Sequence, residues 1–255
     1  MKTNSVHLLV KRAYGRVARK TVSCCKGSSC CGHKTQSASA VPEAELGLSC
    51  GDPTAFLKIK KGMTVVDLGS GAGKDVFIAA QLVGAKGNVI GVDMTADMLK
   101  LARKNRLKFI ERVGYSNIEF RKGLIEKLPL RSGETDLIIS NCVINLSPDK
   151  PAVFREAFRV LKPGGRVVIS DIVLNREMPP GLKKQAGLYA ACIAGALLRE
   201  DYVSAIRSAG FGRIKILSDK LYSAGLSEPD PITSKTGNAL DGLASSITIE
   251  AIKPG

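Results

Sequence analysis

The sequence predicts an α/β fold in which a mostly parallel sheet carries helices on both faces. From Met63 onward, short runs rich in β-branched residues alternate with longer stretches of helical period. Strand, helix and strand repeated in this way are typical of a parallel sheet with helical crossovers. The 255 residues, 44% of them hydrophobic, can also bury the substantial core that such a sheet requires.

Seven strands are predicted, each a short apolar run bounded by turn residues. The first five cover residues 64–67, 88–93, 117–121, 136–141 and 165–171. The last two, residues 213–217 and 246–252, are separated by a loop and predict an antiparallel pair at the sheet edge.

Apolar residues recur at helical spacing between these strands, and one segment interrupts the alternation of strands and helices. The predicted helices cover residues 74–83, 96–111, 152–161 and 201–209, and the third ends at the Pro-Gly-Gly turn of residues 163–165. Residues 175–200 are predicted to be an inserted, lid-like segment with an apolar helix that contains Cys192.

The net charge of +15 is concentrated at the N-terminal end. Residues 1–42 contain eight Lys or Arg and no acidic residue, whereas the rest contains 30 basic and 23 acidic residues. We therefore divide the chain into a basic, Cys-rich segment, residues 1–43, and a domain of residues 44–255. A basic segment suggests a nucleic-acid-binding arm or a transit peptide. It lacks aromatic residues beyond Tyr14, and no basic stripe accompanies it, so we expect no nucleic-acid partner.

Cysteine content and hydropathy bear on the compartment. No apolar stretch approaches the roughly 18 residues of a membrane helix. Seven cysteines, an odd number without a secretory signal, argue against a disulfide framework. We expect a cytoplasmic monomer with no membrane partner.

A glycine-rich turn directly follows the first strand. Gly69, Gly71 and Gly73, with Ser70 between them, form G-x-G-x-G and not the G-x-G-x-x-G of dinucleotide sites. Asp67 ends the strand inside this turn, where its carboxylate would repel a pyrophosphate and attract the ammonium group of an amino acid. The pattern favours S-adenosylmethionine as the cofactor.

The ends of the next strands supply the other predicted cofactor residues. Asp93 ends the second strand and is placed to accept hydrogen bonds from ribose hydroxyls. Parallel strands bring their carboxyl ends to one crevice. The remaining candidates follow the second, third and fourth strands, with Leu124 or Ile125 bordering the adenine: Met94, Leu124, Ile125, Glu126, Asn141 and Val143.

Five stretches of the sequence resemble the arsenite S-adenosylmethionine methyltransferase family: residues 65–75, 91–95, 140–150, 159–165 and 192–196. The first and fourth occur in many methyltransferases, whereas 140–150 and 192–196 are more specific to the family. Residues 10–18, with Tyr14-Gly15, resemble its N-terminal helix. The resemblance implies a Rossmann-like class I methyltransferase fold and methyl transfer to arsenic for detoxification.

The resemblance also implies that Cys50, Cys142 and Cys192 are the catalytic residues and bind trivalent arsenic as the substrate. Arsenic is a soft centre that prefers thiolates. Three sulfur ligands leave a lone pair that can attack the sulfonium methyl in line, so the enzyme supplies orientation and no general base. Ser49 departs from the Gly-Cys-Gly that the family more often has.

The other four cysteines form two adjacent pairs, Cys24-Cys25 and Cys30-Cys31. Adjacent pairs do not fit the ligand spacing of zinc sites. Methylation oxidises arsenic, so we expect one of these four to cycle with Cys50 and a thiol reductant, such as thioredoxin or glutathione, to restore the thiols. We expect the arsenic acceptor to arrive either as free arsenite or as a thiol conjugate.

Two alternatives remain open. A methyltransferase with a quinone or other small organic acceptor would share the cofactor site, but it gives no reason for three thiols. The second alternative is a non-catalytic thiol sensor that binds arsenic, but it gives no reason for Asp67 and Asp93.

Overall fold

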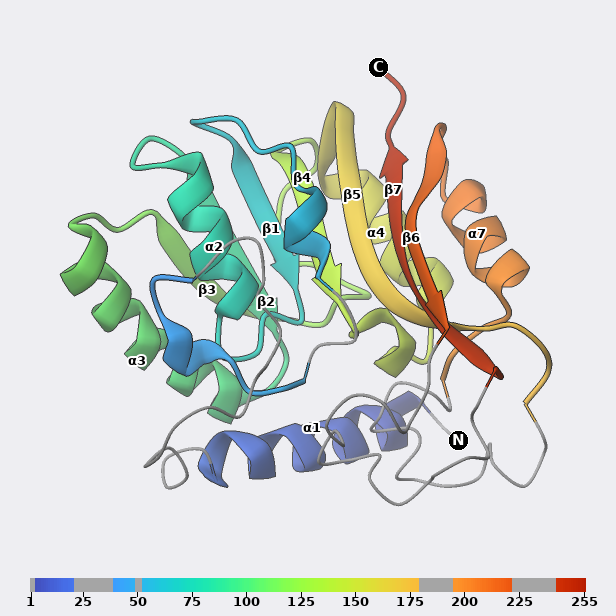
Figure 1. The fold of residues 1–255 in the computed structure, drawn as a ribbon, viewed down its shortest axis with the longest axis horizontal. Coiled ribbons are helices and arrows are strands. Elements are labelled where there is room, and N and C mark those ends of the chain that lie inside the picture. Colours follow the sequence, from blue (N-terminus) through green and yellow to red (C-terminus); the bar gives the residue numbers. More distant parts are fainter. Residues whose placement is uncertain (1–2, 21–38, 49–51, 179–194, 222–241) are drawn as a thin grey trace.

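The computed structural model describes residues 3–20, 39–48, 52–178, 195–221 and 242–255. Its centre is a seven-stranded sheet with the order β3-β2-β1-β4-β5-β7-β6 (Figure 1). All neighbours are parallel except β7, which is antiparallel to both β5 and β6. The strands are β1 (Thr64–Leu68), β2 (Asn88–Asp93), β3 (Ile118–Lys122), β4 (Thr135–Asn141), β5 (Leu161–Leu174), β6 (Ile214–Leu221) and β7 (Ala244–Ile252).

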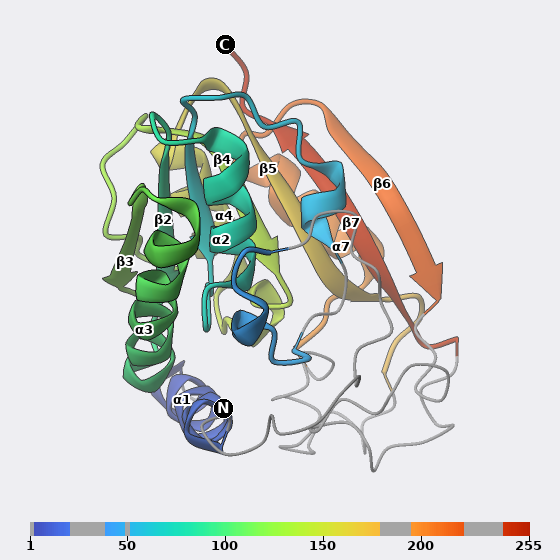
Figure 2. The same cartoon turned by 60° about the vertical axis from the view of Figure 1, so that its left-hand side comes forward.

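Helices cover both faces of the sheet (Figures 1 and 2). One face carries α2 (Lys74–Val83) and α3 (Ala96–Val113), and the other carries α4 (Lys150–Val160) and α7 (Arg199–Ser208). Short 3-10 turns are η1 (Pro42–Ala44), η2 (Pro53–Phe56) and η3 (Ile144–Leu146). The predicted fold class is therefore confirmed.

The predicted helices and strands agree most closely with the structure where a short stretch of sequence determines their bounds. The bounds of β2 and α2 are those predicted. The predicted antiparallel pair is present, and the reversed strand β7 lies between β5 and the edge strand β6. In contrast, β5 begins at Leu161, before the Pro-Gly-Gly turn. The Gly164 N–H donates to Lys253 O (3.1 Å), so the end of β7 holds this turn within the sheet.

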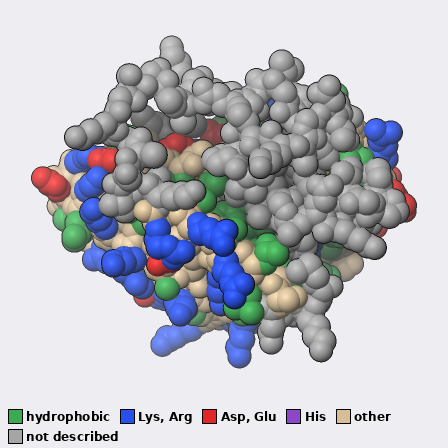
Figure 3. All heavy atoms as spheres, turned by 90° about the horizontal axis from the view of Figure 1, so that it is seen from below, with side chains coloured by type: hydrophobic (Ala, Val, Ile, Leu, Met, Phe, Trp, Pro, Cys, Tyr) green, Lys and Arg blue, Asp and Glu red, His purple; other side chains and the backbone are tan. Residues whose placement is uncertain are grey.

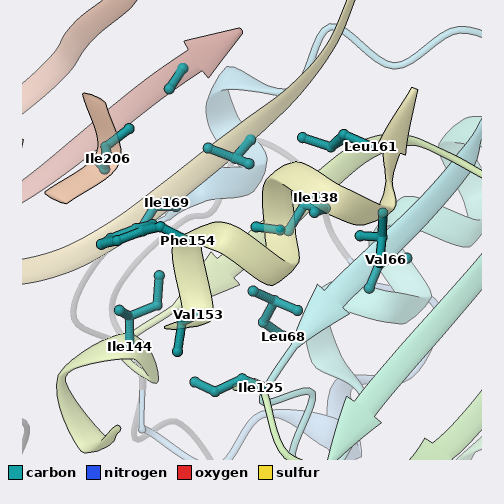
Figure 4. Close-up of a cluster of buried hydrophobic side chains, with 14 of the residues drawn as sticks. Val66, Leu68, Ile125, Ile138, Ile144, Val153, Phe154, Leu161, Ile169 and Ile206 are labelled. Carbon is teal, nitrogen blue, oxygen red and sulfur yellow. The ribbon is translucent and has the colours of Figure 1, made fainter. Parts of the chain in front are cut away.

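The layer between the sheet and α4 is closely packed (Figure 4). Phe154 of α4 is fully buried and makes an edge-to-face contact with Tyr202 of α7, with ring centroids 5.4 Å apart. Side chains of the central strands, among them Leu68, Ile138 and Ile169, belong to the same buried cluster. Each such side chain contributes roughly 1.5–3 kcal/mol through burial. The strand ends therefore rest on a layer of buried, mutually packed side chains.

Helix α1 (Thr3–Lys20) lies across the carboxyl ends of the strands (Figures 1 and 2). Val6 and Val10 are buried in one cluster with Cys142. Arg19 pairs with Asp97 of α3 at the C-terminal end of the helix. The helix predicted within residues 10–18 is therefore longer and packs directly on the domain. Among the described segments, none of the helices has the length and apolarity to cross a membrane.

Candidate functional site

A pocket lies at the carboxyl ends of β1, β2 and β4, and α1 closes one side of it. It brings together most of the predicted cofactor residues: Asp67, Gly69, Ser70, Gly71, Asp93, Met94, Ile125, Glu126, Asn141 and Val143. Cys142 lines the same pocket. Two predicted residues do not line it, because Gly73 packs against the rings of Phe77 and Phe120, and Leu124 pairs with Lys127.

The glycine turn needs its glycines for space and for backbone conformation. Gly69 has a φ of 68°, and a Cβ atom there would overlap the side chain of Val143. Gly73 has a φ of 97° and precedes α2. Both conformations are accessible to glycine without steric cost. The turn consequently passes close to the end of β4 and leaves its backbone exposed to the pocket.

Asp93 organises this turn as well as lining the pocket. Its Oδ2 accepts from the Gly71 N–H (3.0 Å), and its Oδ1 accepts from the Thr95 N–H (2.7 Å). Burial raises the pKa of Asp93, and these backbone hydrogen bonds lower it. Each carboxylate oxygen keeps a further lone pair, so the group can also accept from the hydroxyls of a ribose.

Three buried carboxylates gather in the pocket. Burial raises the pKa of Asp67 well above its usual value, and the charges of Asp75 and Asp93 raise it further. Burial also raises the pKa of Asp75, whose Oδ2 accepts from Asn141 Nδ2 (3.2 Å). A cationic ligand would relieve this repulsion. The ammonium and sulfonium charges of S-adenosylmethionine fit such a site.

Unsatisfied polar atoms in the same wall point to a polar ligand. Ser70 Oγ and Asp75 Oδ1 are buried and have no hydrogen-bond partner among the described residues. Buried polar atoms are nearly always paired in native proteins. Lys74, beside Asp75, forms an ion pair with Glu45, and both side chains line the pocket.

Cys142 has an unusual backbone conformation. Its φ of 55° is the only positive value among the described non-glycine residues. Such a conformation costs about 1–3 kcal/mol and is found mainly at functional sites. Its side chain is 4% exposed and disulfide-bonded. The other predicted arsenic ligands, Cys50 and Cys192, lie outside the described residues, as do Cys24, Cys25, Cys30 and Cys31.

Several pocket residues were missed by sequence reasoning. His7 Nε2 lies 3.0 Å from Glu126 Oε1, which also accepts from Ser147 Oγ (2.5 Å). Only tertiary packing brings α1 to these residues, so His7 and Ser147 carried no local signal. Asp75 could have been predicted from the sequence, because an acidic residue in the first helical turn after a glycine loop faces the same crevice.

The fold and this pocket define a class I methyltransferase. A methyltransferase domain family model matches residues 59–220, and the chain belongs to that family. It is 37% identical to an arsenite methyltransferase of Halobacterium salinarum over 96% of this chain and 66% of the relative. An arsenite methyltransferase of Aquipseudomonas alcaligenes is 40% identical over 84% of this chain and 64% of its own length.

A solved structure agrees with these relatives. The arsenic(III) S-adenosylmethionine methyltransferase CrArsM of Chlamydomonas reinhardtii superposes with a TM-score of 0.66 and 36% identity, over 81% of this chain and 67% of that one. The resemblance to the arsenite methyltransferases and the prediction of S-adenosylmethionine as cofactor are confirmed. The chain spans about two thirds of the length of these relatives.

Proposed function

We propose that this protein transfers a methyl group from S-adenosylmethionine to trivalent arsenic held by cysteine thiolates. The observation that carries the proposal is the position of Cys142, a buried cysteine in the wall of the pocket that Asp67 and Asp93 also line. A methyl acceptor bound to Cys142 would share one enclosed space with the cofactor. The identities to arsenite methyltransferases support arsenic as that acceptor.

The chain's own residues hold the cofactor and fix its direction. S-adenosylmethionine would supply an electrophilic methyl group on a sulfonium. Asp93 and the glycine turn hold the nucleoside end, while Asp67 and Asp75 attract the cationic amino-acid end. These contacts contribute orientation, which lowers the barrier without an acid or base.

The acceptor chemistry follows from three thiolates. We propose that Cys50, Cys142 and Cys192 bind arsenic through sulfur and leave its lone pair free. The lone pair forms the arsenic–carbon bond as the sulfur–methyl bond breaks, and arsenic is formally oxidised by two electrons. Two thiols return these electrons as they form a disulfide. A thiol reductant, such as thioredoxin or glutathione, then restores them, which also suits a cytoplasmic location. Cys142 is disulfide-bonded in the structure, so it must be reduced before its sulfur can bind arsenic.

The surface beside the pocket suits an anionic form of the substrate. Arg12 and Arg16 of α1 and Lys100 and Lys104 of α3 are exposed. Figure 3 shows Lys and Arg side chains gathered on this face of the molecule. A positive surface raises the encounter rate of anions in a salt-dependent way. Anionic thiol conjugates of arsenic would gain from it.

The test is a comparison of acceptors. The reduced protein is incubated with methyl-labelled S-adenosylmethionine and either arsenite or a demethylated quinone, and the labelled products are identified by mass spectrometry. We expect labelled methylarsenic species with arsenite and no labelled quinone. Label on the quinone alone would establish the organic-acceptor alternative. Arsenic binding without any transfer would establish the sensor.

A further inference from the structure

The loop that carries Cys142, residues 142–147, rests on three consecutive residues of β5. The Cys142 N–H donates to Ser170 O (2.9 Å). The side-chain amide of Asn145 donates to Asp171 Oδ1 (2.8 Å) and to Ile172 O (2.6 Å). One short stretch of a central strand therefore fixes both Cys142 and Asn145.

Asn145 is fully buried between the ammonium group of Lys150 and the carboxyl group of Asp171. Lys150, 8% exposed, donates from Nζ to the backbone oxygens of Ser147 (3.0 Å) and Asn145 (3.4 Å). Asp171, 1% exposed, holds the side chain of Asn145 and accepts from the Tyr202 hydroxyl at Oδ2 (3.1 Å). Burying ionisable groups is unfavourable, so stability alone gives no reason for this arrangement.

The orientation of the Asn145 side chain also lowers the stability of the folded state. Both of its amide acceptors lie on one side, so Oδ1 points away from them. That oxygen is buried without a hydrogen-bond partner in the described part of the chain. An unpaired buried polar atom lowers the stability of the folded state. Together with the strained backbone at Cys142, it indicates that the loop is held for position at the expense of stability.

The returning chain, residues 195–197, touches the same residue through Gly195. A Cβ atom at Gly195 would overlap the carbonyl oxygen of Asn145. Directly afterwards, the Leu174 N–H donates to Leu197 O (2.8 Å) and joins this chain to β5. Gly195 follows Cys192 by three residues in the sequence. Asn145 is therefore the contact between the loop of Cys142 and the chain that follows Cys192.

We propose that Asn145, held by Asp171 and Lys150, is a positioning residue that sets Cys142 relative to the chain following Cys192, and thereby the affinity for the arsenic acceptor. This inference rests on the proposed function, because the distance between Cys142 and the chain following Cys192 matters when two thiols share one ligand. Asn145 does not line the pocket, so it acts through Cys142 and not on the cofactor.

A matched pair of variants tests the role of Asn145. Asn117 is also a buried asparagine, and its amide donates to Ala80 O and Gly84 O, away from the pocket. We expect Asn145→Ala to raise the KM for arsenite by about tenfold or more, since small misplacements of reacting groups have large kinetic effects. The Kd for S-adenosylmethionine should stay within about twofold of wild type. Asn117→Ala should change neither constant.

Two further changes separate positioning from folding. Asp171→Asn keeps an acceptor for Asn145 and offers a donor to Tyr202, so the KM for arsenite should stay near wild type. Asp171→Ala should raise it as Asn145→Ala does. Gly195→Ala leaves the hydrogen bonds of Asn145 in place but displaces the returning chain, and it should also raise this KM. An equal KM in Asn145→Ala and Asn117→Ala, or a parallel loss of cofactor affinity in Asn145→Ala, would overturn the proposal.

A second readout keeps this test independent of catalysis. If the wild-type protein does not methylate arsenite, the proposed function fails, and the alkylation rate of reduced Cys142 by iodoacetamide still reports on the loop. We expect Asn145→Ala to be alkylated about threefold faster or more, because local opening exposes the thiol. Asn117→Ala should match wild type. Equal rates in all three proteins would overturn the positioning role itself.

Discussion

Asp93 holds the glycine turn and also lines the pocket. Its two oxygens hold Gly71 and Thr95 while it lines the pocket. We expect Asp93→Ala to weaken S-adenosylmethionine binding by roughly 1–3 kcal/mol, as measured by calorimetry. Asp219→Ala, on β6 and paired with Arg199, is the matched control and should leave the affinity unchanged. Equal affinities in the two variants would remove Asp93 from the site.

The carboxylates of the pocket predict a pH dependence of cofactor binding. The pKa values of Asp67, Asp75 and Asp93 are raised. A cationic ligand favours their ionised forms, so binding releases protons and the affinity should rise with pH until these groups are ionised. Calorimetry in buffers of different ionisation enthalpy measures the release. Asp67→Asn should reduce it, and an affinity independent of pH in the wild-type protein would contradict this account.

Helix α1 completes the wall of the pocket. Val10 is 3% exposed and faces the pocket, whereas Leu8 on the same helix is 55% exposed. Val10→Asp buries an unpaired charge and should detach the helix, so we expect the affinity for S-adenosylmethionine to fall by about tenfold or more. Leu8→Asp, measured in the same titration, should bind as wild type does. A similar Kd for both variants would show that α1 plays no part in binding.

The elements also show which features sequence alone can predict. The glycine turn, Asp67 and Asp93 were predictable because each lies at the end of a strand. The spacing of apolar residues and the residues of the turn, which predict such strand ends, are both found within a short stretch of sequence. The start of β5 was not predictable, because Leu161 pairs with Thr135 and the end of β7 holds the following turn. His7 and Ser147 meet at Glu126 only when α1 packs on the domain. Long-range packing, which leaves no periodic signal, accounts for these differences.

Asp171 links the free energy of unfolding to pH. Burial raises its pKa to about 7, while hydrogen bonds from Ile172 N–H and the Tyr202 hydroxyl and the charge of Lys150 lower it. The unfolded chain ionises this group near pH 4. Between these values the folded state holds a proton that the unfolded state lacks. Asp171 therefore lowers the free energy of unfolding as pH rises, by at most about 1.4 kcal/mol per pH unit.

Asp171→Asn isolates this contribution, because other carboxylates act equally in both proteins. Under reducing conditions, urea unfolding from pH 5 to 8 should show the variant gaining stability relative to wild type up to about pH 7. Above that value the difference should be constant. A difference that does not change with pH would mean that Asp171 is ionised throughout the range.

In the proposed mechanism, arsenic accepts the methyl group while it is bound to Cys142. The most direct measurement is a single turnover of wild type and Cys142→Ser with arsenite and methyl-labelled S-adenosylmethionine, with cofactor binding followed in the same samples. We predict labelled methylarsenic from wild type, none from Cys142→Ser, and equal cofactor affinity in both. Undiminished methylarsenic from Cys142→Ser would contradict the account.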